Sequence, residues 1–290
     1  MQAYEVHKTN GGVRDCGRFF LDMVGKYPPE RVRVKWSTLS RPVSEAVTEL
    51  IDKTWAEQME KAQGTDRRLF NGQLCRLEDC STTGDDLTLD LGPIDFKTFL
   101  GTNLTHAHLR YEYGPDILGD ALGVSAALQT NDGFLLLGRR SEHVYYHAGR
   151  IHPIGGVVQP PEEPDQLPCP FRTMAEELLE ECAMPGEKIT EMICLGLVRD
   201  KHIVQPEMIF DVCVDAGVAE LREGARKADD NMEHCELLHV RNHPSSVISF
   251  IEANAADLTA VGLASLLLHG LRHWGTGWFA TARGYLRSMY

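Results

Sequence analysis

The first half of the chain contains one segment with a clear helical pattern. Apolar residues recur every three or four positions between Val43 and Met59, which predicts an amphipathic helix. Ser40 or Ser44 is expected at its start, because a serine side chain can accept a hydrogen bond from a main-chain N–H of the first turn. Gly64 is expected to end the helix, since glycine is common just after a last turn.

Shorter patterns follow this helix. They predict two strands, over residues 68–78 and 87–91, with a turn over 81–85 between them. A short helix is predicted next, over 95–103, and Gly101 is expected to end it. One long helix combined with strands indicates an α+β region over residues 1–118.

From residue 119 onward, strands alternate with apolar or acidic helices. Two apolar runs flank Asn131-Asp132-Gly133, and an Asp-Gly pair between such runs is typical of a β-hairpin. Residues 258–271 form a nearly continuous apolar helix, which is expected to be buried against a sheet. Strands are expected over 123–128, 133–139, 151–154, 192–198, 208–214 and 237–240. We therefore predict a second, α/β domain over residues 119–290.

Composition and charge restrict the function. The 290 residues are 43% hydrophobic and 24% charged, which is typical of a globular protein. A formal net charge of −13 argues against nucleic acid as a partner, because such binding needs basic patches. No apolar run reaches the roughly eighteen residues of a membrane span. The eight cysteines form no CxxC pair, so we expect reduced thiols, a cytoplasmic location and no cysteine-based zinc site.

Three acidic residues share one face of a predicted helix. Glu177, Glu180 and Glu181 stand at positions i, i+3 and i+4, so their Cβ atoms are expected about 5–6 Å apart. Like charges at this spacing destabilise a helix, whereas Mg²⁺ bound by carboxylate oxygens reverses that penalty. The alternative is a solvated acidic face without a metal.

The segment before this helix favours the metal. A predicted strand over 151–154 leads into Gly155-Gly156, and Glu162 follows in a proline-rich loop. Strand, glycine pair, acidic loop and acidic helix together form a unit that can present several carboxylates to one diphosphate.

This unit resembles the Nudix box of the Nudix hydrolases. Gly156 and Glu162 match the first half of the pattern. The second half is matched by Glu177, Leu178, Glu180, Glu181 and Met184. The chain departs in three ways: the gap after Glu162 is six residues longer, Glu176 replaces the usual Arg, and Ala183 replaces the usual Gly.

A wider resemblance covers most of the chain from about residue 43. The blocks 99–103, 122–128 and 134–141 resemble UDP-glucose diphosphatases within the Nudix family. The resemblance implies an α/β/α sandwich with a mixed sheet and an N-terminal α+β extension. It also implies hydrolysis of UDP-glucose or UDP-galactose to UMP and sugar 1-phosphate, with Mg²⁺ or Mn²⁺ as cofactor.

Within that chemistry, the carboxylates take different expected roles. Glu177, Glu180 and Glu181 are candidate metal ligands, and Glu162 is a weaker one. Glu177 and Glu181 are also candidate catalytic residues, because a glutamate of the box could itself serve as the general base. A general base from outside the box is expected at Glu207 or Glu233, each near the start of a predicted strand; the alternative for both is a surface acid at a strand end.

Substrate anions and the nucleoside need donors. Arginines at strand ends can grip phosphate through two hydrogen bonds, although a solvated strand end is an equal alternative. Thr102 and Asn103 offer donors and acceptors for a base or ribose, or serve in a turn. The candidate substrate-binding residues are Arg139, Arg140, Arg199, Thr102, Asn103, Gly155 and Gly156.

Two other functions stay open. One keeps the chemistry but changes the substrate to ADP-ribose, a dinucleotide or a coenzyme A species. The other is a catalytically silent Nudix-fold protein that binds a nucleotide; the intact acidic trio argues against it. Gly155-Gly156 lacks the G-x-G-x-x-G order of a dinucleotide-binding fold. The sequence leaves the oligomeric state open.

Overall fold

The computed structural model describes residues 14–38, 41, 43–63, 69–161, 163, 165–228 and 233–288. Ser40, Gly64, Arg68 and Glu162 lie outside these ranges, so the predictions made for them stay untested. Ser44 is confirmed as the cap of the first helix, because its side chain accepts a hydrogen bond from the N–H of Val47.

A nine-stranded mixed sheet forms the centre of the molecule. Its order is β1-β2-β10-β11-β6-β7-β12, with β8 paired to β7 and β9 paired to β6. Only β11 and β6 run parallel within the described part of this sheet. The strands are β1 Arg14–Asp15, β2 Phe19–Tyr27, β6 Gly123–Gln129, β7 Phe134–Arg140, β8 Ile151–His152, β9 Ile154–Val157, β10 Ile189–Asp200, β11 Pro206–Val214 and β12 His234–Arg241.

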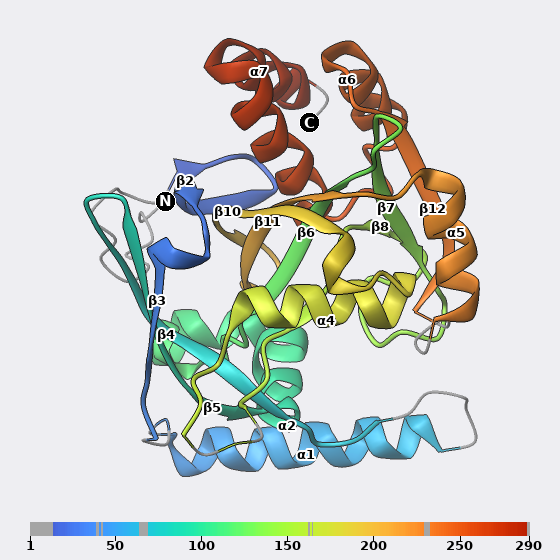
Figure 1. Cartoon of the computed structure of the whole chain (residues 1–290). Helices are drawn as coiled ribbons and strands as arrows, with labels where there is room; N and C mark the ends of the chain where they lie inside the picture. Colours follow the sequence, from blue (N-terminus) through green and yellow to red (C-terminus); the bar gives the residue numbers. More distant parts are fainter. Residues whose placement is uncertain are drawn as a thin grey trace.

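Helices cover both faces of this sheet (Figure 1). Met208 and Phe210 of β11 pack in a core with α4 and α5, whereas Ile209 between them packs in a second core with α6 and α7. This alternation follows from the two-residue period of a strand. The bounds are α4 Pro170–Cys182, α5 Val218–Lys227, α6 Pro244–Ala253 and α7 Ala260–Ser288, with a kink at Gly275 in α7. The predicted α/β/α sandwich with a mixed sheet is confirmed.

A smaller sheet and a long helix make up the rest of the first part. β5 is central, parallel to β3 and antiparallel to β4. Its Leu87, Leu89 and Leu91 belong to the same core as α4, which therefore lies between the two sheets (Figure 1). The elements are β3 Val32–Trp36, α1 Glu45–Ala62, β4 Gln73–Thr83, β5 Asp86–Asp95, α2 Phe96–Phe99 and α3 Arg110–Tyr113, with short 3₁₀ turns at Pro29–Arg31, Ala107–Leu109, Pro115–Ile117 and Gly186–Lys188.

Two local predictions were wrong in this part. Gly101 does not end the short helix, because α2 continues into a π-type turn over Leu100–Leu104. A Cβ at Gly101 would lie 3.0 Å from the Ile51 Cα, so glycine here lets α1 approach closely. The expected turn over 81–85 is shorter, since β4 extends to Thr83 and only two residues separate it from β5.

Strand pairing crosses the boundary predicted at residue 118. β2 pairs with β10, so the large sheet takes strands from both parts. At the end of β10, Arg199 donates hydrogen bonds to Asp22 at 2.8 Å and to Asp120 at 3.0 Å, and all three side chains are buried. This triad ties β2, β10 and the segment before β6 together. The division into 1–118 and 119–290 stays a prediction.

All eight cysteines are free thiols. Within the described residues, no helix has both the length and the apolar character needed to cross a membrane. The cytoplasmic location stays a prediction.

The buried triad makes Arg199 a strong determinant of stability. Arg199→Ala leaves Asp22 and Asp120 as buried carboxylates without their cation, so the free energy of unfolding should fall by about 3–5 kcal/mol. Urea denaturation measures this loss. Arg33→Ala is the control, because Arg33 pairs with Asp86 at an exposed position and should cost less than about 1 kcal/mol. Equal losses in the two variants would contradict the role of the triad.

Candidate functional site

The acidic segment is helical as predicted, and its ends explain why. Pro170 occupies the first turn of α4, where the missing N–H of proline costs little. Met174 and Leu178 are fully buried one turn apart and so fix the rotation of the helix. Ala183 ends the helix in the left-handed conformation, with φ 49° and ψ 37°. That conformation explains why Gly is usual at this position.

Glu177 and Glu180 line a cavity of about 500 Å³ beside the proline-rich loop. Among the described residues, four carboxylates and one arginine border this cavity, and Nε of that arginine, Arg172, lies 3.7 Å from Oε1 of Glu176. The excess of negative charge suits a cation. The lining residues are Gln159, Pro160, Pro161, Glu163, Gln166, Arg172, Thr173, Glu176, Glu177 and Glu180.

The glycine pair brings β9 against the carboxylates of α4. The N–H of Gly155 donates to Glu181 Oε1 at 3.3 Å. A Cβ on Gly156 would lie 1.7 Å from Glu177 Oε1, and a Cβ on Gly155 would lie 2.0 Å from the carbonyl oxygen of Val124. Gly155 is therefore required by the neighbouring backbone of β6, whereas Gly156 lets β9 pass the Glu177 carboxylate without displacing it.

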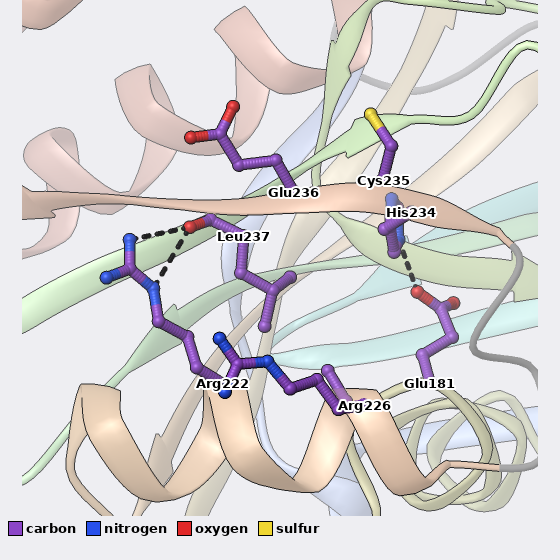
Figure 2. A pocket seen from close by; sticks show the side chains of 8 residues that line it. Glu181, Arg222, Arg226, His234, Cys235, Glu236 and Leu237 are labelled. Atoms are coloured by element: carbon purple, nitrogen blue, oxygen red, sulfur yellow. Dashed lines mark hydrogen bonds and ion pairs between the residues drawn. The ribbon is translucent and has the colours of Figure 1, made fainter.

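Glu181 faces a different neighbourhood from Glu177 and Glu180. Its side chain is almost fully buried, and Oε2 lies 2.5 Å from Nε2 of His234 on β12. Figure 2 shows His234 pointing down from the strand to Glu181. The two residues line a second cavity of about 550 Å³, together with Arg222, Ala225, Arg226, Cys235, Glu236 and Leu237.

The three acids therefore share a helical face without sharing one cavity. The reason is that β12 runs past the end of α4, and His234 there contacts the Glu181 carboxylate. Glu181 as a direct metal ligand stays a prediction.

Arg140 and Glu233 form a buried ion pair near the box. Arg140 Nη1 lies 2.6 Å from Glu233 Oε1, and its guanidinium carbon lies 5.2 Å from the centre of the Tyr146 ring. Burial opposes the charge on Arg140, but Glu233, Tyr146 and Glu181 together outweigh burial and raise the pKa of the guanidinium. Burial also raises the pKa of the Tyr146 hydroxyl, which feels the charges of Arg140, Glu207, Glu233 and Glu177. Of the predicted arginines, Arg140 is the one whose charge interacts with carboxylates of the site, Glu181 and Glu207.

Glu207 is the most perturbed acid of the site. It lies at the start of β11, where Ser125 Oγ donates a hydrogen bond to Oε1 at 2.5 Å. A Cβ on Gly123 would lie 2.0 Å from Oε2, so the carboxyl packs directly on the backbone of β6. Burial raises the pKa of Glu207 to about 8, more than the Ser125 hydrogen bond and Arg140 lower it. A carboxyl with a pKa near neutrality can exchange a proton with water during a reaction.

The other two predicted arginines have protein partners. Arg139 points to the opposite face of the sheet, where it donates to Gly149 O at 2.9 Å and to Asp257 at 3.1 Å. Arg199 belongs to the buried triad with Asp22 and Asp120. Substrate binding by these two arginines stays a prediction.

Thr102 and Asn103 are buried and satisfied within the fold. Thr102 Oγ1 donates to Thr98 O at 2.7 Å and accepts from the N–H of Gly119 at 2.9 Å. Asn103 Nδ2 donates to Ile203 O at 2.9 Å, and its oxygen accepts from the N–H of Asp120. These contacts agree with the alternative prediction that the two residues serve in a turn. Nucleoside binding by the pair stays a prediction.

Sequence analysis missed His234, Ser125 and Tyr146. The strand predicted at 237–240 begins three residues earlier, which puts His234 on β12 beside α4. Ser125 is a single polar residue inside a buried apolar run, a weak signal that the Glu207 partner was nearby. Tyr146 lies in an irregular loop and carries no periodic signal.

The donors around α4 fit a hard divalent cation. Glu177 and Glu180 provide carboxylate oxygens at one cavity, and Mg²⁺ or Mn²⁺ is commonly held by one or two carboxylates with substrate phosphates completing the shell. The close approach of Gly156 to Glu177 also keeps that side of the carboxylate free of a protein Cβ. Glu162 lies outside the described residues, so its role stays a prediction.

Sequence comparison relates the chain to Nudix proteins. It is 30% identical over 210 residues to the uridine diphosphate glucose pyrophosphatase of Homo sapiens. The aligned region covers 61% of this chain and 66% of that protein. For the Bos taurus protein of the same name, identity is 30% over 155 residues, covering 44% and 53%. Nudix hydrolase 9 of Arabidopsis thaliana is 23% identical over 220 residues, covering 64% and 70%. The chain thus spans less than two thirds of the first two relatives. No family model matches it.

Several solved structures resemble part of the chain. A pyrophosphohydrolase of Bacillus subtilis is 15% identical, with a TM-score of 0.36 over 55% of this chain and 85% of that chain. A MutT protein of Methanosarcina mazei is 22% identical, with a TM-score of 0.29 over 44% and 80%. A Nudix hydrolase of Nitrosomonas europaea is 16% identical, with a TM-score of 0.34 over 53% and 89%.

The two glycines should respond differently to alanine. Gly155→Ala places its Cβ against main-chain atoms that cannot move aside, so the free energy of unfolding should fall by about 2 kcal/mol or more. Gly156→Ala meets only the end of the Glu177 side chain, which can rotate away. That variant should unfold within about 1 kcal/mol of the wild type but hold divalent metal more weakly. Urea denaturation and metal titration separate the two effects, and unchanged metal affinity in Gly156→Ala would count against the site.

Proposed function

We propose that this relative of the Nudix hydrolases is itself a divalent-metal-dependent diphosphatase, and that its substrate is a UDP-sugar. The proposal rests on one observation above all. Glu177 and Glu180 line a common acidic cavity on α4, and the glycine pair of β9 lies directly against the same helix face. The products would be UMP and a sugar 1-phosphate.

The chemistry needs charge neutralisation before water can reach an anionic diphosphate. Mg²⁺, or Mn²⁺, held by Glu177 and Glu180 would supply that neutralisation and acidify a bound water. The chain's own residues set the geometry around it. Gly155 donates its N–H to Glu181, and His234 holds the other oxygen of that carboxylate, so Glu181 is fixed in orientation beside the box.

A general base outside α4 is supported most by Glu207. Its carboxyl is buried against Gly123 and Ser125, and burial raises its pKa to about 8. Near that pH it can accept a proton from an attacking water and return it later. Glu233 is the weaker candidate, because its carboxylate is already engaged by Arg140 at 2.6 Å in a buried ion pair.

Substrate choice follows from the names of two relatives. The human and bovine proteins are uridine diphosphate glucose pyrophosphatases at 30% identity. A UDP-sugar is therefore our first candidate. ADP-ribose, a dinucleotide and a coenzyme A species are the alternatives that the same assay distinguishes.

Removing one carboxylate should abolish most of the activity without unfolding the chain. Glu180→Gln and Glu181→Gln should each lower turnover of UDP-glucose by at least about a hundredfold. Release of UMP and sugar 1-phosphate with excess Mg²⁺ measures the rate. Glu252→Gln on α6 is the matched control, because its exposed side chain lies far from α4, and it should retain the wild-type rate.

Two outcomes of this assay contradict the proposal. Full activity in Glu180→Gln and Glu181→Gln would show that the helix carboxylates do not carry the reaction. Binding of UDP to the wild type without turnover of any substrate in the panel would instead support a silent nucleotide-binding protein.

Glu207 should make stability depend on pH. The pKa of its carboxyl rises from an ordinary 4.5 to about 8 in the folded chain. The contribution of the protonated carboxyl to the free energy of unfolding is therefore fully present below pH 4.5 and is lost as pH rises towards 8. Glu207→Gln keeps the shape of the uncharged carboxyl and removes its pH-dependent loss of stability. The unfolding free energy of the variant relative to wild type should therefore rise with pH, by up to about 1.4 kcal/mol per pH unit. Urea denaturation across this window tests it, and a pH-independent difference would exclude the raised pKa.

A further inference from the structure

A cluster of metal-ligating side chains lies on the face of the large sheet opposite α4. Asp211 projects from β11 towards α7, where His269 and His273 stand one helical turn apart. His269 Nδ1 lies 3.0 Å from Asp211 Oδ1, and His273 Nε2 lies 2.7 Å from Asp211 Oδ2. In the part of the chain that the structure describes, this is the one group of three such residues whose ligand atoms all lie within 4.8 Å of one another.

Two amide side chains determine where a proton lies in this cluster. The nitrogen of the Gln129 amide faces Asp211 Oδ1 at 2.8 Å, as it must, because a carboxylate only accepts hydrogen bonds. The Gln129 oxygen therefore accepts from Asn242 Nδ2 at 2.9 Å. The Asn242 oxygen is then left facing His269 Nε2 at 2.9 Å, so Nε2 carries the hydrogen.

This order of contacts turns the other nitrogen of His269 towards a negative oxygen. A neutral imidazole carries hydrogen on one nitrogen only, so Nδ1 would present its lone pair to Asp211 Oδ1. Both side chains are fully buried, and water does not separate them from each other. The contact is repulsive unless a positive charge lies between the two atoms, either a proton or a metal ion.

The neighbouring arginine does not saturate the negative charge. Arg272 donates to Asp211 at 2.9 Å and to Glu191 at 2.7 Å. Two carboxylates against one guanidinium leave one negative charge before any further cation is counted. The two carboxylates therefore leave room for a further cation beside Arg272.

We propose that Asp211, His269 and His273 bind Zn²⁺ at a site separate from the carboxylates of α4. Two imidazole nitrogens with one carboxylate suit Zn²⁺, whereas Mg²⁺ prefers an all-oxygen shell. Zinc lies about 2.0–2.2 Å from such atoms, so the imidazole of His273 must move back slightly. That side chain is 33% exposed and has room to rotate. The bound ion ties α7 to β11 and leaves a coordination position open to solvent.

Zinc binding by the full chain tests the proposal. The protein is dialysed against Zn²⁺ in the presence of excess Mg²⁺, which occupies the oxygen ligands of α4, and bound zinc is counted by elemental analysis. The wild type should retain one equivalent more than His273→Ala, and its zinc affinity should be at least about tenfold higher than that of the variant. Co²⁺ in place of Zn²⁺ should give a tetrahedral visible spectrum in the wild type only.

A histidine outside the cluster provides the control. His202→Ala removes an exposed histidine elsewhere and should bind zinc as the wild type does. His273→Ala is kept only if its circular dichroism matches the wild type; otherwise His273→Gln replaces it. If the wild type and the folded His273 variant bind zinc equally, or if neither binds it, the charge at His269 is a proton and the proposal is wrong. UDP-sugar hydrolysis is not a readout, so this test stands apart from that of the diphosphatase.

Discussion

The close approach of β9 to α4 is the contact on which the candidate site depends. Gly155 reaches Glu181 with its N–H, and Gly156 passes so near Glu177 that a single Cβ would collide with the carboxylate. Glycine is the only residue that permits this approach without moving the strand or the acid. The same contact sets Glu177 beside β9, and Glu177 and Glu180 line the acidic cavity next to the proline-rich loop.

The rest of the fold holds α4 in register for that contact. Met174 and Leu178 are buried between the large sheet and the leucines of β5, so the helix cannot rotate to turn its acids elsewhere. β12 then adds His234, which holds Glu181 on the far side from the proline-rich loop. The N-terminal part thus contributes to the site by packing under α4. The polar atoms of Thr102 and Asn103 contact the fold itself, and nucleoside binding by this pair stays a prediction.

Sequence patterns predicted those elements that have a clear hydrophobic period or a characteristic turn. The acidic helix, the Asp132-Gly133 hairpin and the apolar start of α7 are all present, because each depends on contacts within a few residues. Long-range partners could not be read in the same way. Nothing local indicates that Arg199 meets Asp22 and Asp120, or that His234 reaches α4. Two short helices, α5 and α6, escaped as well, although α5 spaces its apolar residues helically.

In the proposed reaction, the carboxylates of α4 bind a divalent cation against the diphosphate. Anomalous X-ray scattering from crystals of the full chain soaked with Mn²⁺ and UDP locates that cation directly. We expect a manganese peak about 2.0–2.2 Å from oxygens of both Glu177 and Glu180, with a phosphate of UDP completing its shell. A crystal that binds UDP but shows its manganese away from α4, or shows none, would contradict it.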